Sequence, residues 1–148
     1  MNTDEELVRL GYDLAISPRV SAARLMEQRL LDDHFVTVAR RDHPVVKKKL
    51  TLSQFVALDH IQIAVGATPG GPVEDALGAP MIVAKSDLIL TLANRIARAL
   101  APLLDLQIFP TPIPVKPFSI HQMWHEQKQA DPAHVWFRSL IASVAKAI

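Results

Sequence analysis

Hydrophobic and polar residues form short blocks along the chain, and most blocks end at a proline or a glycine. Residues 25–31 and 35–39 form a long extended stretch in which Val36 and Val38 share one face. Pro44 ends this stretch, because a pyrrolidine ring cannot donate a hydrogen bond to a neighbouring strand. The pattern predicts two strands followed by a charged turn.

Strands and helices alternate along the rest of the chain. Apolar alternation predicts further strands over residues 12–16, 60–65, 106–109 and 118–125. Helical spacing and capping residues predict helices over residues 3–10, from Thr51 or Ser53 to Ala57, from Pro72 onward, over 87–104 and from Pro132 onward. This order predicts an α/β fold with helices on both faces of a sheet.

Two of these helices have the clearest patterns. Residues 87–104 are rich in leucine, isoleucine and alanine and are predicted to form the strongest helix of the chain. The final helix is predicted to have one apolar side, which consists of Val135, Trp136, Leu140, Ile141 and Val144.

The composition narrows the function classes. A formal net charge of +1 provides no broad positive surface for a phosphate backbone, so the chain itself is not expected to bind DNA. The absence of cysteine fits a reducing compartment, and the acidic first residues do not read as a signal peptide. The longest apolar run contains Arg95 and Arg98 and cannot span a membrane. We therefore expect a cytoplasmic protein.

No catalytic or metal site is predicted. His121 and His125 are four residues apart but fall in an alternating strand, where the helical geometry of a zinc motif does not apply. The serines lack the Gly-x-Ser-x-Gly context of a hydrolase, so we expect a protein that is not an enzyme and holds no cofactor. Lys47-Lys48-Lys49 is interpreted as a solvated turn, since no aromatic residues are interleaved with it.

The glycine-rich loop over residues 66–72 is a candidate ligand loop. Thr68, Gly70 and Gly71 come just before a predicted helix, whose first N–H groups and dipole favour an anion. The loop also follows a predicted strand, where open α/β sheets bind ligands. Glycine-rich loops are common, so an ordinary connection is the alternative.

One segment and several shorter fragments resemble a known family. The segment LLDDHFVTVARRDHP over residues 30–44, followed by LTLSQF over residues 50–55, resembles the effector-binding domain of LysR-type transcriptional regulators. The resemblance is closest to the branch that responds to aromatic acids and nodulation signals. Further fragments follow in the family's order at residues 12–16, 86–92, 123–125 and 131–136.

The resemblance implies a two-lobed fold of the periplasmic-binding-protein-like type 2. Lobe I would hold residues 1–40 and 118–148, approximately, and lobe II residues 45–115. A small effector, such as an aromatic or other organic acid, would bind in the cleft between the lobes and control transcription. The parent protein would form dimers and tetramers and bind DNA through an N-terminal helix-turn-helix domain that this chain lacks.

The chain also departs from the family pattern. The first strand-helix-strand of lobe I is absent, and roughly fifteen residues that the family has between Ala79 and Pro80, a length near one mean strand and its flanks, are missing. We therefore expect a partial domain with a partial pocket. A free-standing periplasmic-type solute-binding protein is the alternative function, against which the lack of a signal peptide weighs.

The resemblance also implies effector-binding residues. It places His34 in the cleft, matches Arg95 to a family arginine near the effector, and adds Ser17 to the set. A guanidinium fork suits a carboxylate, so loss of the Arg95 side chain is expected to cost on the order of 2–3 kcal/mol of effector affinity. The alternatives are a histidine paired with a neighbouring aspartate and a surface arginine alongside Arg98, which is the near-neutral control.

Overall fold

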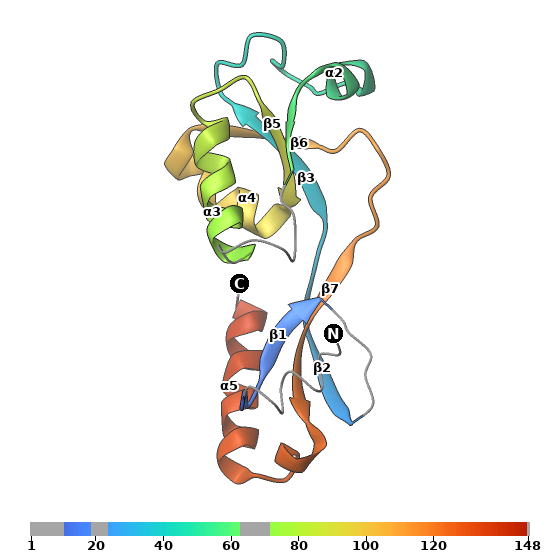
Figure 1. The fold of residues 1–148 in the computed structure, drawn as a ribbon, viewed down its shortest axis with the longest axis vertical. Helices are drawn as coiled ribbons and strands as arrows, with labels where there is room; N and C mark the ends of the chain where they lie inside the picture. The colour runs from blue at the N-terminus through green and yellow to red at the C-terminus, as the bar shows by residue number, and fades with distance from the viewer. Residues whose placement is uncertain (1–10, 19–23, 63–71, 148) are drawn as a thin grey trace. The chain divides into compact units, whose positions relative to one another are not determined.

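The computed structural model describes residues 11–18, 24–62 and 72–147, and the chain folds as two compact units (Figure 1). Unit 1 comprises residues 1–33 and 118–148, and unit 2 comprises residues 34–117. We expected the first lobe to extend to about residue 40. The chain passes into unit 2 after Asp33 instead, because the strand that follows pairs only within the sheet of unit 2.

Unit 1 is an antiparallel three-stranded sheet with one long helix. Its strands are β1 (Ala15–Pro18), β2 (Leu25–Asp33) and β7 (Phe118–His125), in the order β1-β7-β2. A 3-10 turn, η1 (Glu126–Lys128), leads into α5 (Pro132–Ala147), which packs against the sheet. The bounds of β7 and the start of α5 are those predicted from the alternation and from the Asp131-Pro132 cap.

The first strand lies later in the chain than its sequence pattern predicted. It begins at Ala15 rather than at Tyr12 and continues through Pro18. Pro18 is tolerated because β1 is at the edge of the sheet, where one side of the strand needs no donors.

The α5 helix buries polar side chains. The helix buries His134 and Arg138, while most of the predicted apolar side is exposed. Trp136 is 66% exposed and Val144 is 54% exposed. The four-residue spacing of His134 and Arg138 selects a different helix face, because these side chains find hydrogen-bond partners in unit 1.

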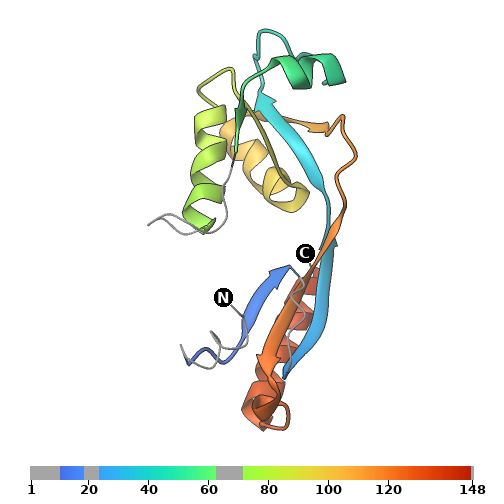
Figure 2. The same ribbon diagram turned by 45° about the vertical axis from the view of Figure 1, so that its right-hand side comes forward.

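Unit 2 is a four-stranded mixed sheet with helices on both faces, as the sequence predicted. The strands are β3 (Phe35–Arg40), β4 (His60–Ile61), β5 (Ile89–Ala93) and β6 (Leu106–Pro110), in the order β4-β5-β3-β6. The helices are α2 (Leu52–Ala57), α3 (Pro72–Val83) and α4 (Asn94–Leu104). Figure 2 shows α3 and α4 together on one face of the sheet, with α2 away from them.

The predicted helix over residues 87–104 is wrong in its first part. Ile89–Ala93 is a strand that pairs antiparallel with β3 and parallel with β4, and the helix begins only at Asn94. A short continuous apolar run fits a fully buried strand as well as a helix. Pairing with β3 and β4 makes this run a strand, in which Ile89 and Leu90 are completely buried.

Two apolar clusters hold unit 2 together, one on each face of the sheet. The larger lies under α3 and α4 and consists of Val36, Val38, Ala79, Val83, Leu90, Leu92, Ala97, Ala101 and Leu106. The smaller lies on the α2 side and consists of Ala39, Val46, Leu50, Ile89 and Phe109. The α2 helix starts at a capping box formed by Thr51 and Gln54, as its sequence predicted.

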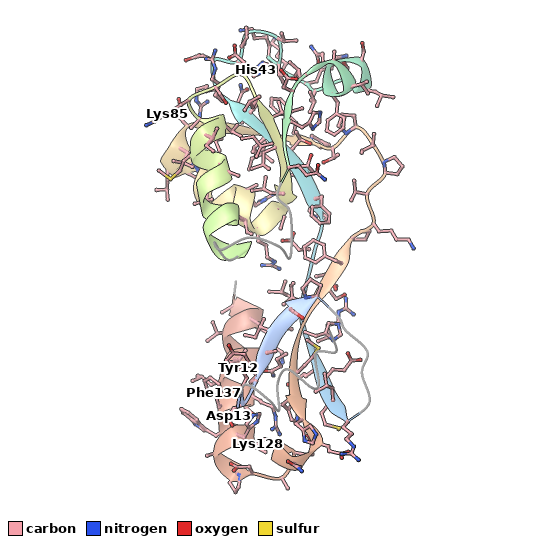
Figure 3. All side chains as sticks on the ribbon, viewed as in Figure 1. Tyr12, Asp13, His43, Lys85, Lys128 and Phe137 are labelled. Carbon is pink, nitrogen blue, oxygen red and sulfur yellow. The ribbon has the colours of Figure 1, made fainter. Side chains whose placement is uncertain are left out.

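A buried histidine secures the turn after β3. The His43 ring is fully buried, and its Nδ1 accepts hydrogen bonds from the backbone N–H groups of Val45 and Val46. Its Nε2 therefore carries the proton and donates to the carbonyl of Asp87 at 2.9 Å. The ring joins two turns that are distant in sequence (Figure 3).

Candidate functional site

A hollow of about 470 Å³ opens on unit 2 where β3, α4 and β6 meet. Its polar lining is His34, Asn94, Arg98 and Thr111. Its apolar lining is Phe35, Val36, Ile108, Phe109, Pro110, Ile113, Pro114 and Val115. The volume is in the range of small-molecule sites, which combine apolar walls with a few placed polar groups.

Local hydrogen bonds position the polar side of this hollow. The Asn94 backbone N–H donates to the carbonyl of His34 at 2.8 Å, which attaches the first turn of α4 to the start of β3. One turn further along α4, the guanidinium of Arg98 donates to the Asn94 side-chain oxygen at 3.3 Å. The strand-to-helix switch at Asn94 therefore brings an imidazole, an amide and a guanidinium to one place.

The opposite side of the hollow comes from the proline-rich segment after β6. The hydroxyl of Thr111 lies 3.2 Å from that of Thr37 on β3, so this segment is held against the sheet. The prolines fix an extended backbone, and their rings form an apolar wall.

This arrangement suits a small acid with an apolar body. A guanidinium presents two parallel N–H groups to a carboxylate, and Arg98 is exposed enough to offer them. An imidazole provides a second donor, while the phenylalanine and proline walls can cover a ring.

The structure brings together some of the predicted site residues and separates others. His34 lines the hollow, but Arg95 does not, although it is half-buried on the first turn of α4. Arg98, which we expected to be the neutral control, lines it instead. Both arginines are on α4, and Arg98 is the one on the helix face that lines the hollow.

The remaining predicted residues are not in this hollow. Ser17 lies on β1 in unit 1, and its hydroxyl donates to the carbonyl of Pro18 at 2.8 Å. Thr68, Gly70 and Gly71 lie outside the described residues. Within the described part of the chain, no group of three or more histidine, aspartate or glutamate side chains could hold a metal ion. No described helix is long and apolar enough to cross a membrane.

Unit 1 contains a buried polar network. The guanidinium of Arg138 donates to the carbonyls of Lys128 and Gln129 and to Nδ1 of His134, and it lies 4.2 Å from the centre of the Trp124 ring. His134 Nε2 in turn donates to the carbonyl of Asp13 at 2.8 Å. The acceptors of these hydrogen bonds from Arg138 all belong to the protein itself. We therefore interpret the network as structural.

Carboxylates at the rim of this network are stabilised in their charged form. A hydrogen bond from Lys128 lowers the pKa of Asp13 below its ordinary value, and the same pair raises the pKa of Lys128 (Figure 3). The Asp131 carboxylate accepts a hydrogen bond from the His134 backbone N–H, which lowers the pKa of Asp131 and caps α5.

No family model matches the chain, but comparison with individual proteins does find relatives. The chain is 31% identical over 138 residues to the HTH-type transcriptional regulator SyrM of Rhizobium meliloti, a match that covers 81% of this chain and 42% of SyrM. It is 25% identical over 160 residues to Nodulation protein D 2 of Rhizobium tropici, covering 95% of this chain and 51% of that protein. The chain thus spans about half the length of these relatives.

Solved structures show the same fold. The regulatory domain of MetR, a LysR family regulator from Neisseria meningitidis, matches with a TM-score of 0.69 at 14% identity, over 98% of this chain and 75% of that one. The expected α/β fold of the periplasmic-binding-protein-like type is therefore confirmed. Together the matches confirm the predicted resemblance: the chain is a homologue of the LysR-type transcriptional regulators, over the part that forms their regulatory domain.

Proposed function

We propose that this chain senses a small organic acid, with an aromatic acid as the preferred class, and that it is the regulatory domain of a LysR-type transcriptional regulator. The observation that carries the proposal is the hollow of unit 2, in which His34, Asn94 and Arg98 face an apolar wall. Homology to transcriptional regulators, rather than to enzymes, supports a binding function. The bound acid would act as a signal and not as a substrate.

In this proposal Arg98 anchors the carboxylate, and His34 supplies a second donor. The apolar wall around Phe35 and Ile113 covers the body of the ligand. Arg95, Ser17 and the loop residues Thr68, Gly70 and Gly71 remain candidates through the family resemblance alone. The proposal thereby reverses the roles that the sequence suggested for Arg95 and Arg98.

The family resemblance also suggests where the parent protein acts and what it binds. We propose that the parent protein is cytoplasmic, self-associates as a dimer or tetramer, and binds DNA through an N-terminal helix-turn-helix domain. The present chain should then show no sequence-specific DNA binding in a gel shift at physiological salt, because its formal net charge is only +1.

The experiment is calorimetric titration of the protein with benzoate and salicylate, with benzamide as the neutral analogue. Both acids should bind more tightly than the amide. Replacing Arg98 by alanine should cost on the order of 2–3 kcal/mol of affinity, the range for hydrogen bonds to charged groups.

Arg95→Ala provides the internal comparison on the same helix, and Lys85→Ala controls for the loss of one surface charge. Equal small losses in all three variants would show that Arg98 is only a surface charge and that the hollow is not the acid site. Arg95→Ala as the single damaging variant would restore the assignment made from the family resemblance.

A further inference from the structure

Unit 2 has a second hollow, of about 580 Å³, beside the edge of its sheet. Lys47, Lys48, Lys49 and Leu50 line one side of it, from the loop that follows β3. Residues 107–112, from β6 and the start of the proline-rich segment, line the other side. We refer to this hollow as the lysine groove.

The lysines of the groove carry uncompensated charge. All three are exposed, and none has a hydrogen bond or an ion pair within the described part of the chain. Neighbouring cations of unit 2 differ, because Arg40 pairs with Asp87 and Arg41 pairs with Asp105. Three like charges in consecutive positions repel one another, so an anion placed among them is stabilised.

The floor of the groove is apolar. Ile108 is 37% exposed although it lies on a strand, and Pro110 is exposed beside it. The polar side chains of the lining are already occupied, since Gln107 donates to the carbonyl of Arg41 and the hydroxyl of Thr111 lies near that of Thr37. The groove therefore offers a ligand cationic groups at its rim and hydrocarbon at its floor.

The groove also follows the free edge of a sheet. Among the described strands, β6 lies at one end of the sheet and pairs only with β3. Pro110 and Pro112 cannot donate hydrogen bonds and restrict how far a new strand could extend. An occupant would thus be recognised mainly by its side chains.

We propose that the lysine groove docks an extended acidic segment of a partner protein, with its carboxylates at Lys47, Lys48 and Lys49 and its apolar side chains on Ile108. Charge complementarity selects an anionic partner, and the apolar floor selects a peptide over a nucleic acid. A sugar-phosphate backbone carries no aliphatic side chains that could cover Ile108 and the prolines. This docking function goes beyond the sensing of an effector, although residues 108–111 line both hollows.

Fluorescence anisotropy tests the proposal with a dye-labelled ten-residue peptide in which glutamate and leucine alternate. The wild-type chain should bind it in a salt-dependent manner. The combined variant Lys47→Gln, Lys48→Gln, Lys49→Gln should bind at least tenfold more weakly. Ile108→Asp, which puts a carboxylate in the floor, should weaken binding by a similar factor.

The matched control is Lys85→Gln, Lys116→Gln, Lys146→Gln, which removes the same number of exposed charges elsewhere. This control should change the affinity less than twofold, and circular dichroism should show that all variants are folded. Equal losses of peptide affinity in the two triple variants would show that binding depends only on the net charge of the protein, and this would overturn the proposal. So would an undiminished affinity for a peptide in which serine replaces leucine, or tighter lysine-dependent binding of duplex DNA.

Discussion

The two units of this protein are stabilised in different ways. Unit 2 has apolar clusters on both faces of its sheet, whereas the buried apolar side chains described in unit 1 are only Met123 and Trp124. In their place unit 1 buries the polar side chains of Asp33, His121, Gln122, His134 and Arg138. One unit depends on apolar burial, which has no preferred direction, and the other on hydrogen bonds, which must be satisfied one by one.

The difference shows what unit 1 leaves uncovered. Its helix buries polar side chains and turns apolar ones outward, so a large apolar surface faces solvent; the exposed apolar residues of this unit include Tyr12, Ile16, Met26, Val135, Trp136, Phe137, Leu140 and Val144. Apolar side chains that gather on one exposed surface suit contact with a partner. Unit 1 also has weaker internal support, because Gln122 Oε1 is buried with no hydrogen-bond partner among the described residues.

The largest effect is expected in the core of unit 2. Leu90 is fully buried between the strands and the helices, so Leu90→Ala should lower the free energy of unfolding by about 2–5 kcal/mol. Urea denaturation followed by circular dichroism measures the loss. Leu140→Ala, on the exposed side of α5, is the matched control; a loss as large as that of Leu90→Ala would mean that α5 buries this face.

The second largest loss of stability is expected when the polar network around Arg138 in unit 1 is disrupted. Arg138→Met keeps the hydrocarbon stem but leaves two carbonyls and a histidine nitrogen without a donor, at a cost of about 2–3 kcal/mol. The two tryptophans, Trp124 and Trp136, both lie in unit 1, so their fluorescence reports on this unit alone.

The fluorescence transition of Arg138→Met should therefore move to lower urea, while the later part of the transition seen by circular dichroism stays in place. Arg29→Ala, which removes an exposed ion pair with Asp32, should leave both nearly unchanged. Coincident shifts of both signals would show that the two units unfold as one.

A smaller effect is expected on self-association. The exposed apolar side of α5 favours a dimer or a larger species at high micromolar concentration, as measured by light scattering. Leu140→Glu should raise the dissociation constant about tenfold, which corresponds to about 1.4 kcal/mol. A wild-type chain that remains monomeric at high micromolar concentration would contradict this prediction.

The smallest expected effect is the loss of stability of unit 1 at low pH. The pKa values of Asp13, Asp32 and Asp131 are all lowered in the folded protein, by hydrogen bonds from Lys128, Arg29 and the His134 backbone respectively, and all three residues belong to unit 1. A lowered carboxyl pKa adds stability that is fully present above the unfolded value and is lost as the pH falls below roughly 4 through the folded value.

Acid titration should consequently change tryptophan fluorescence at a higher pH than it causes the last part of the circular dichroism change, which reports unit 2. In the Asp13→Asn variant the fluorescence should depend less on pH in this range. If the fluorescence of this variant follows the wild-type curve, the Lys128 pair does not contribute to the acid sensitivity of unit 1.

Local signals in the sequence determined several elements and the family. The alternation over residues 35–39 and 118–125 predicted β3 and β7, and the caps at Thr51 and Asp131 predicted the starts of α2 and α5. These predictions hold because strand alternation and helix capping depend on neighbouring residues only. The motif over residues 30–44 likewise identified the family of regulators that the comparisons confirmed.

Tertiary structure alone decided the rest. Ile89–Ala93 became a strand because β3 and β4 were available as partners, and α5 turned outward because Arg138 found its acceptors inside unit 1. On α4, Arg98 rather than Arg95 lines the hollow with His34. Each of these features depends on contacts between residues that are far apart in sequence. A local pattern does not show which distant residues a segment will contact.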